Sequence, residues 1–194
     1  MHIPNFSFLP GPSVPGAVFE HAKRKIELVD QLLFHVFIAS QHEMERWEND
    51  DSLSSDEMKD IIPEEREWQD EIKSQATQLC VVCLYRVVEF TRKALILRLP
   101  GSPSARELSS IERVDAVYES HCGQPHRNLM GFAAADELRC LNNCIKHDGF
   151  VSKTLACYPG WVIDEPIGRV IAAYYRLAPV VPDYLREFAD RLSK

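Results

Sequence analysis

The chain has 194 residues, 45% of them hydrophobic, which is enough for one sizeable core. Its formal net charge of -7 argues against nonspecific adhesion to DNA or to anionic membranes, because such adhesion requires a basic surface. No apolar run has the length of a membrane helix, and the first residues lack the order of a signal peptide. We therefore expect a cytoplasmic protein that does not contact the membrane.

The first 16 residues are predicted to form an extended arm. They contain four prolines, which are incompatible with a regular helix interior, and three large apolar residues that can pack against a core. These residues are Pro4, Pro10, Pro12 and Pro15, and Phe6, Phe8 and Leu9. We assign residues 1–16 to the arm and residues 17–194 to a single helical-bundle domain.

Two long helices are predicted in the first half of the chain. Apolar residues at steps of three and four predict a helix from about Gly16 to Trp47. After a polar loop, Ser54 or Ser55 is placed to cap a short helix. Pro63 suits a first helical turn and is followed by acidic residues, so it predicts the start of a second long helix that ends before Pro100.

Shorter helices are predicted to follow. Ser104 and Glu107 have the spacing of a capping box and predict a third helix, which ends near Gly123. The next helix should start between residues 129 and 133 and end at His147, with Gly149 as a left-handed C-terminal cap.

The C-terminal part is predicted to hold two more helices. Asp164 and Pro166 have the order of an N-cap and an early helical proline, ahead of a helix from Ile167 to Leu177. Asp183 restarts the helical pattern after two prolines. Because no strand pattern is found, the predicted fold class is all-α: a helical bundle with two long antiparallel helices and several shorter packed helices.

The helix that should end at His147 carries the most informative motif. Arg139, Asn143 and His147 are four residues apart, a spacing that puts side chains on one face of a helix. An arginine, an amide and a histidine on one face can bind a phosphate group and transfer a proton. The same residues can also form a purely structural polar seam.

This motif resembles that of HEPN domains, the higher eukaryotes and prokaryotes nucleotide-binding domains. It comprises Leu138-Arg139, Asn142-Asn143 and Lys146-His147-Asp148-Gly149, and the resemblance covers mainly residues 64–150. The family signature is an arginine, then a polar residue, with a histidine four to six residues after the arginine. The resemblance implies a helical nucleotide-binding fold. Catalytic members of the family are metal-independent ribonucleases that act as dimers with a shared cleft.

The resemblance assigns roles to five residues. His147 matches the family histidine, Asn143 matches the polar residue, and Asn142 stands where the arginine is most often found. Arg139 lies eight residues before His147, outside the usual spacing, so the phosphate-binding cation is missing or displaced. The candidate catalytic residues are thus His147, Arg139 and Asn143, and the candidate nucleotide-binding residues are Asn142 and Lys146.

Two interpretations of these residues remain open. A helix C-terminus favours the imidazolium form, which suits His147 to phosphate binding or to general-acid catalysis. In the structural interpretation, Asn142 and Asn143 make buried hydrogen bonds, His147 caps the last carbonyl groups and Lys146 faces water.

The cysteines offer a weaker signal. Cys80 and Cys83, with Cys140, Cys144 and His147, could in principle supply zinc ligands from two helices. Apolar neighbours favour core packing instead, so we expect reduced thiols, no metal and no cofactor. Arg86 and Arg92 on the second long helix are candidate auxiliary phosphate ligands, although a solvated helix face is the more common interpretation. His126 follows a Gly-Gln-Pro turn and carries no functional signal.

The sequence leaves two functions open. The first is a HEPN-like protein that binds nucleotide or RNA or cleaves RNA, a toxin or defence effector restrained by an antitoxin-type partner. The second is a noncatalytic helical interaction module that retains a degenerate HEPN motif. The exposed faces expected on the long helices also predict a homodimer.

Overall fold

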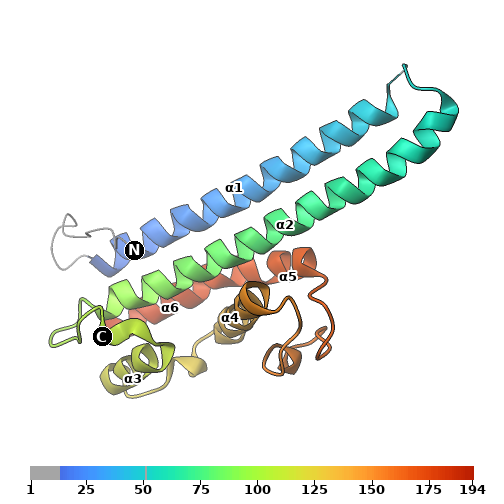
Figure 1. Ribbon diagram of the computed structural model, residues 1–194. Helices are drawn as coiled ribbons and strands as arrows, with labels where there is room; N and C mark the ends of the chain where they lie inside the picture. The colour runs from blue at the N-terminus through green and yellow to red at the C-terminus, as the bar shows by residue number, and fades with distance from the viewer. Residues whose placement is uncertain (1–13, 51) are drawn as a thin grey trace. The chain divides into compact units, whose positions relative to one another are not determined.

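The computed structural model describes residues 14–50 and 52–194, and within them the chain is all-α (Figure 1). Two long antiparallel helices are followed by four shorter ones. Their bounds are α1 Val14–Glu48, α2 Ser55–Ile96, α3 Ile111–Cys122, α4 Phe132–His147, α5 Val170–Leu177 and α6 Val181–Leu192. The described residues contain no named strand and one isolated β-bridge, between Phe150 and Pro166. The predicted fold class is confirmed.

Contacts between residues divide the chain into two compact units. Among the described residues, the first unit contains residues 14–26, 85–139 and 177–194, and the second contains residues 27–50, 52–84 and 140–176. This division does not test whether residues 17–194 form a single domain, which remains a prediction. Residues 1–13 of the predicted arm lie outside the described residues.

The first helix starts earlier than the sequence predicted. α1 begins at Val14, so the last three residues assigned to the arm are helical. The reason is that Pro15 lies in the first turn, where a missing backbone N–H has no helical partner to lose. The prediction that these three residues are extended was wrong.

The second long helix is not divided at Pro63. α2 runs without interruption from Ser55 to Ile96, so the separate short helix was wrong. Its N-terminus is a capping box, in which Ser54 N donates to Glu57 Oε2 at 2.9 Å and Glu57 N donates to Ser54 Oγ at 3.3 Å. Pro63 is exposed, so water can reach the carbonyl group that the proline leaves without a helical donor.

Only half of the predicted capping box at Ser104 forms, because Glu107 N donates to the carbonyl oxygen of Ser104 and not to its hydroxyl group. It does not open the third helix. Ser104 N donates to Glu107 Oε2 at 2.8 Å, and only the short 3-10 turn η1 (Glu107–Ser109) follows. Leu108 leaves the helical region, with φ -84° and ψ 24°. Ser110 then caps α3 through its Oγ, and Gly123 ends the helix at φ 68°, as predicted.

Of the later helices, α5 and α6 differ from prediction at their starts, whereas α4 does not. α4 begins within the predicted window and ends at His147, with Gly149 at φ +70°. α5 begins at Val170 because residues 164–167 pair with residues 149–151, and Ile167 N donates to Gly149 O at 2.8 Å. α6 begins at Val181, since Pro182 is accepted in its first turn.

Each unit has its own core. In the first, Tyr118 stacks on Phe188 with ring centroids 4.4 Å apart, and both side chains are fully buried. In the second, the buried Tyr174 donates a hydrogen bond to Asp30 Oδ1 at 2.5 Å. Burial of these aromatic side chains makes a large contribution to stability.

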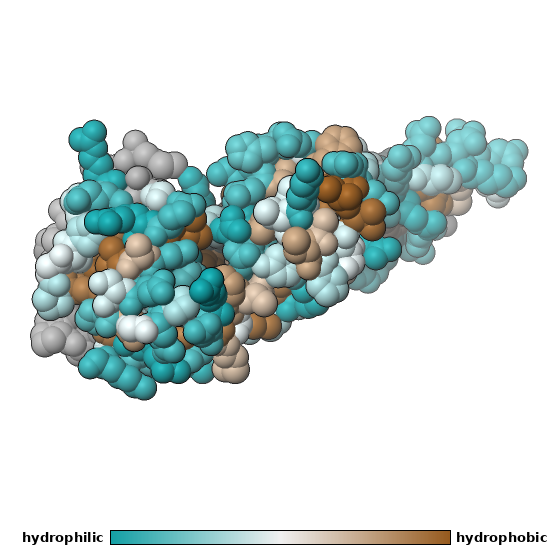
Figure 2. All heavy atoms as spheres, turned by 90° about the horizontal axis from the view of Figure 1, so that it is seen from below, coloured by the Kyte–Doolittle hydropathy of each residue, from teal (hydrophilic) through white to brown (hydrophobic). Residues whose placement is uncertain are grey.

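The face shown in Figure 2 is largely hydrophilic, with separate hydrophobic areas between the polar side chains. No helix in the described part of the chain combines the length and the apolar character that crossing a membrane requires.

Candidate functional site

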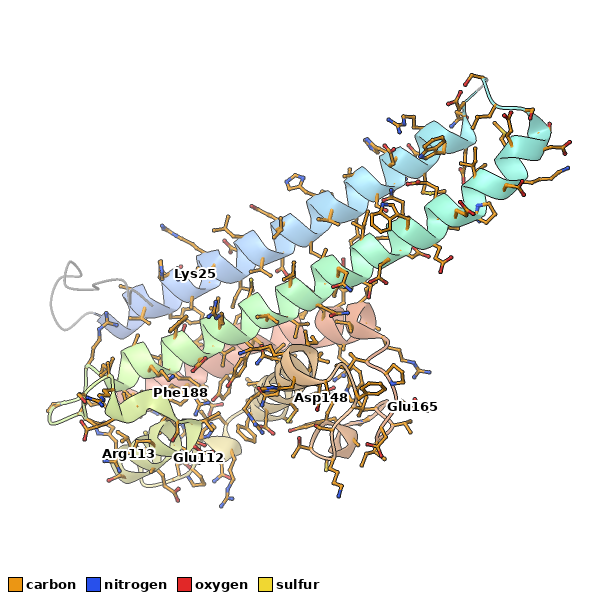
Figure 3. All side chains as sticks on the ribbon, viewed as in Figure 1. Lys25, Glu112, Arg113, Asp148, Glu165 and Phe188 are labelled. Carbon is orange, nitrogen blue, oxygen red and sulfur yellow. The ribbon has the colours of Figure 1, made fainter. Side chains whose placement is uncertain are left out.

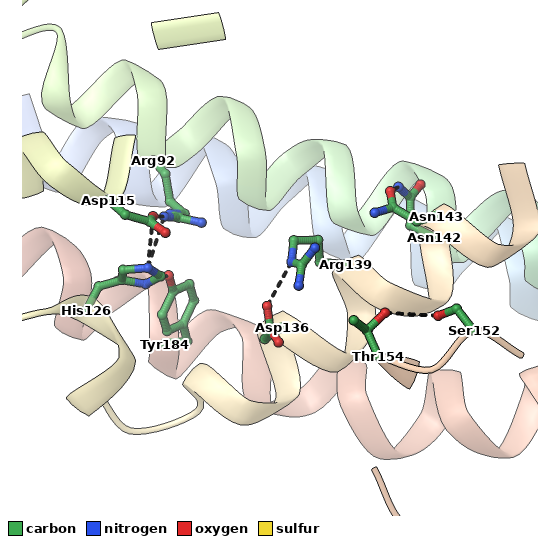
Figure 4. Close-up of polar contacts among 10 residues, drawn as sticks. All are labelled: Arg92, Asp115, His126, Asp136, Arg139, Asn142, Asn143, Ser152, Thr154 and Tyr184. Atoms are coloured by element: carbon green, nitrogen blue, oxygen red, sulfur yellow. Dashed lines mark hydrogen bonds and ion pairs between the residues drawn. The ribbon is translucent and has the colours of Figure 1, made fainter. Parts of the chain in front are cut away.

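The five residues singled out in the sequence all lie on α4, but they have different surroundings. Asn143, Lys146 and His147 are exposed near the C-terminal end of the helix, in the second unit. Asn142 is 2% exposed, and its Nδ2 donates to Asn143 Oδ1 at 3.3 Å (Figure 4). The structure therefore brings the histidine, the lysine and one amide together on the surface of one helix end.

Arg139 is not part of this surface group. It belongs to the first unit, where its Nε donates to Asp136 Oδ1 at 2.8 Å (Figure 4). Eight helical residues correspond to a rise of about 12 Å along the axis. Arg139 and His147 thus lie on different turns of α4.

The C-terminal end of α4 is capped by backbone groups. The N–H groups of Asp148 and Gly149 both donate to the carbonyl oxygen of Cys144, at 3.3 and 3.0 Å. Cys144 Sγ also accepts a bond from Ser152 N at 3.4 Å, which ties the next loop to the helix. These bonds satisfy the carbonyl oxygen of Cys144 through backbone groups, so that oxygen does not need the imidazole of His147.

A second group of polar residues, which the sequence did not connect, surrounds a pocket of about 220 Å³ in the first unit. The pocket lies among α2, α3, α4 and α6 and the 3-10 turn η2 (His126–Asn128). Its lining consists of Tyr85, Val88, Arg92, Ile111, Glu112, Asp115, His126, Phe132, Ala135, Asp136, Arg139 and Tyr184.

His126 has a polar partner at each ring nitrogen. Its Nε2 lies 2.8 Å from Asp115 Oδ1, and its Nδ1 lies 3.0 Å from the hydroxyl oxygen of Tyr184 (Figure 4). Arg92 forms an ion pair with the same oxygen of Asp115. These contacts join α2, α3, η2 and α6, because each element contributes one side chain.

The electrostatics follow from burial and pairing. Burial raises the pKa of Asp115, but the hydrogen bond from His126 and the charge of Arg92 outweigh it, so the pKa lies below its ordinary value. Burial raises the pKa of the Tyr184 hydroxyl to about 12, which keeps it protonated at neutral pH.

The exposed fractions decide what each group can do. His126 is 5% exposed with both ring nitrogens engaged, so it orients Asp115 and does not reach a ligand. The side chains of Asp115, Arg139 and Asp136 are 37%, 27% and 24% exposed and line the opening. The pocket can therefore bind a ligand through these three groups and through Arg92, whose buried side chain also lines it.

The cysteines have contacts of their own. Cys80 Sγ donates to the carbonyl oxygen of Val29 at 3.8 Å, and burial raises the pKa of its thiol to about 11. Cys140 and Cys144 are buried, whereas Cys83 is exposed. Across residues 14–50 and 52–194, no group of three or more His, Cys, Asp or Glu side chains is arranged to hold a metal ion.

Of the two arginines predicted as auxiliary phosphate ligands, Arg92 lines this pocket and Arg86 does not, and His126 was predicted to have no function. The pocket was missed because its residues lie in five separate segments, and no spacing along the chain links them. Comparison with models of protein families, with curated proteins and with solved structures gives no match for this chain.

Proposed function

We propose that the protein is a HEPN-like nucleotide- or RNA-binding protein that binds its ligand at the C-terminal end of α4. The observation that carries this proposal is the exposure of Asn143, Lys146 and His147 together on that helix end. A lysine and an imidazolium can both donate to phosphate oxygens, and an amide can donate to a base or a sugar. The resemblance to HEPN domains supports the same surface.

Cleavage of RNA is the second part of this proposal, and it requires a homodimer. Metal-independent cleavage needs a base, an acid and a cation close to one phosphate group. Arg139 is too far along α4 to join His147 of its own chain. A second copy would supply a second His147 and Lys146, and a toxin or defence effector of this kind would be restrained by an antitoxin-type partner.

Binding is tested by fluorescence anisotropy with a short, end-labelled single-stranded RNA at low salt. We expect the Lys146→Ala/His147→Ala double variant to weaken binding by about tenfold or more, because each lost phosphate contact removes charge-assisted hydrogen bonds. Lys59→Ala is the matched control, since Lys59 is an exposed lysine of the same unit on α2. No RNA binding by the wild type, or equal binding by the double variant, would overturn the proposal.

Cleavage is tested separately, with the same RNA in the presence of EDTA. We expect His147→Ala to abolish any cleavage while the melting temperature stays unchanged, because His147 is exposed. If the wild type binds RNA and leaves it intact, the binding proposal stands and the ribonuclease proposal fails.

One observation favours the second candidate, an interaction module. In the second unit, Leu28, Leu32 and Leu79 are 62%, 57% and 64% exposed. The hydrogen bond from Cys80 Sγ to the carbonyl oxygen of Val29 marks a position where α1 and α2 meet. Leu28 and Leu79 each precede one of these two residues, so we infer from helix geometry that they lie on the same side of the antiparallel pair. Such an apolar face fits a second copy of this chain.

Light scattering after size exclusion tests this dimer. We expect a dimer for the wild type and a monomer for Leu32→Glu/Leu79→Glu, because the new charges would have to be buried. Leu97→Glu is the control, because Leu97 is also an exposed leucine but belongs to the first unit and not to this face. A monomeric wild type at high concentration would contradict the dimer.

A further inference from the structure

The pocket of the first unit is bordered by two pairs of opposite charge. Arg92 of α2 pairs with Asp115 of α3, and Arg139 of α4 pairs with Asp136 one turn earlier (Figure 4). All four residues line the same cavity of about 220 Å³. Two cations and two anions therefore line one pocket that is partly open to solvent.

Arg92 has unused hydrogen-bonding capacity in this space. The residue is 5% exposed, yet its Nε has no hydrogen-bond partner among the residues that the structure describes. Buried donors are nearly always paired, and an unpaired one is costly. Arg92 also borders a cavity of about 20 Å³, which has room for a water molecule but not for a ligand. Of these two cavities, only the larger one has room for a ligand beside Arg92.

The charges select the class of ligand. Glu112 also lines the pocket, so its lining contains three carboxylates and two arginines. A phosphate dianion would meet this net negative charge, and a simple cation would meet the two arginines. A zwitterion carries one anionic group that can pair with the arginines and one cationic group that can pair with the carboxylates.

Part of the remaining lining is apolar. Val88, Ile111, Phe132 and Ala135 form its walls. The volume lies below the roughly 300 to 1,000 Å³ of pockets for drug-sized ligands. A small aliphatic group fits such walls better than a base or a sugar.

We propose that this pocket binds a free aliphatic α-amino acid. The carboxylate of the ligand lies against Arg92 and Arg139, and its ammonium group lies against Asp115 and Asp136. This site is separate from the RNA surface proposed on α4, and it stands or falls independently of it.

The experiment is isothermal titration calorimetry of the full chain with L-valine and with L-leucine. We expect saturable binding of at least one of them. The amide of that amino acid, which lacks the carboxylate, and its N-acetyl derivative, which lacks the ammonium group, should each bind at least about tenfold more weakly. These two analogues keep the side chain and remove one charge at a time.

A variant locates the site. Arg139→Gln should weaken amino-acid binding by about tenfold or more, because a charge-assisted hydrogen bond is lost. Arg139 is partly exposed, so this variant is expected to fold, which thermal unfolding checks. Arg113→Gln is the control, since Arg113 is an exposed arginine of α3 outside this pocket (Figure 3).

The outcomes separate the alternatives. Binding of an amino acid that fails with both analogues and with Arg139→Gln supports the proposal. Binding of inorganic phosphate with no binding of either amino acid overturns it in favour of an anion site. Absence of binding by any probe, or equal affinity of Arg139→Gln, overturns it as well.

Discussion

Asp115 and His126 are joined by a 2.8 Å contact between Oδ1 and Nε2, although one lies on α3 and the other on the turn η2. Arg92 of α2 pairs with the same carboxylate, and Tyr184 of α6 completes the group at the other ring nitrogen. This network holds the first unit together around its pocket.

Asp115→Asn is expected to destabilise the protein by about 2 kcal/mol at neutral pH, because the buried Arg92 loses its counter-charge. The pKa of Asp115 is lowered in the folded state from 3.8, so its ionised form stabilises the fold above that pH. This contribution is lost as the pH falls below 3.8 and through the folded-state pKa. Urea unfolding at several pH values measures it. An equally steep acid dependence in Asp115→Asn would contradict this assignment.

Tyr184→Phe should cost about 1 to 2 kcal/mol in the free energy of unfolding, since it removes the hydroxyl group 3.0 Å from His126 Nδ1 and keeps the ring packing. Tyr175→Phe is the matched control, because Tyr175 is 55% exposed and should change stability by less than about 0.5 kcal/mol. Chemical denaturation of both variants compares them. Equal stability of the two would show that the buried hydrogen bond contributes nothing.

Gly149→Ala should destabilise the protein by about 1 kcal/mol, because φ is +70° at the C-terminal cap of α4. No atom lies within 4 Å of the added Cβ, so the cost is conformational and not steric. Gly168→Ala also meets open space, without a positive φ, and should be neutral or slightly stabilising. Thermal unfolding distinguishes the two, and a neutral Gly149→Ala would argue against the left-handed cap.

Iodoacetamide should modify Cys83 much faster than Cys80. Cys83 is exposed, whereas Cys80 is buried and its thiol has a pKa of about 11, so its reactive thiolate is scarce near neutral pH. Peptide mass spectrometry over a time course of alkylation gives the two rates. Faster modification of Cys80 would mean that α1 and α2 separate readily at the Val29 contact.

Much of the helical architecture was predictable from local rules. The apolar periodicity identified both long helices, and Gly149 marked the end of α4 because a left-handed cap favours glycine. The starts of helices were less predictable. Pro63 is accepted inside α2 at an exposed position, a tertiary property that the local pattern does not contain.

The two candidate sites differ in the same way. Asn143, Lys146 and His147 are neighbours along one helix, so their shared surface followed from spacing alone. The pocket around Asp115 and His126 depends on tertiary packing of segments far apart in the chain, and no sequence spacing records it. Arg139 was placed with His147 by the motif, whereas its ion pair with Asp136 shows that it belongs to the pocket.

The most direct test of nucleotide or RNA binding at the end of α4 is a titration of the isotopically labelled protein with a short single-stranded RNA, followed by NMR of the backbone amides. The proposal predicts that the largest chemical-shift changes fall on residues 143–149 and increase to saturation. Absence of changes there, or changes confined to the face formed by Leu28, Leu32 and Leu79, would contradict it.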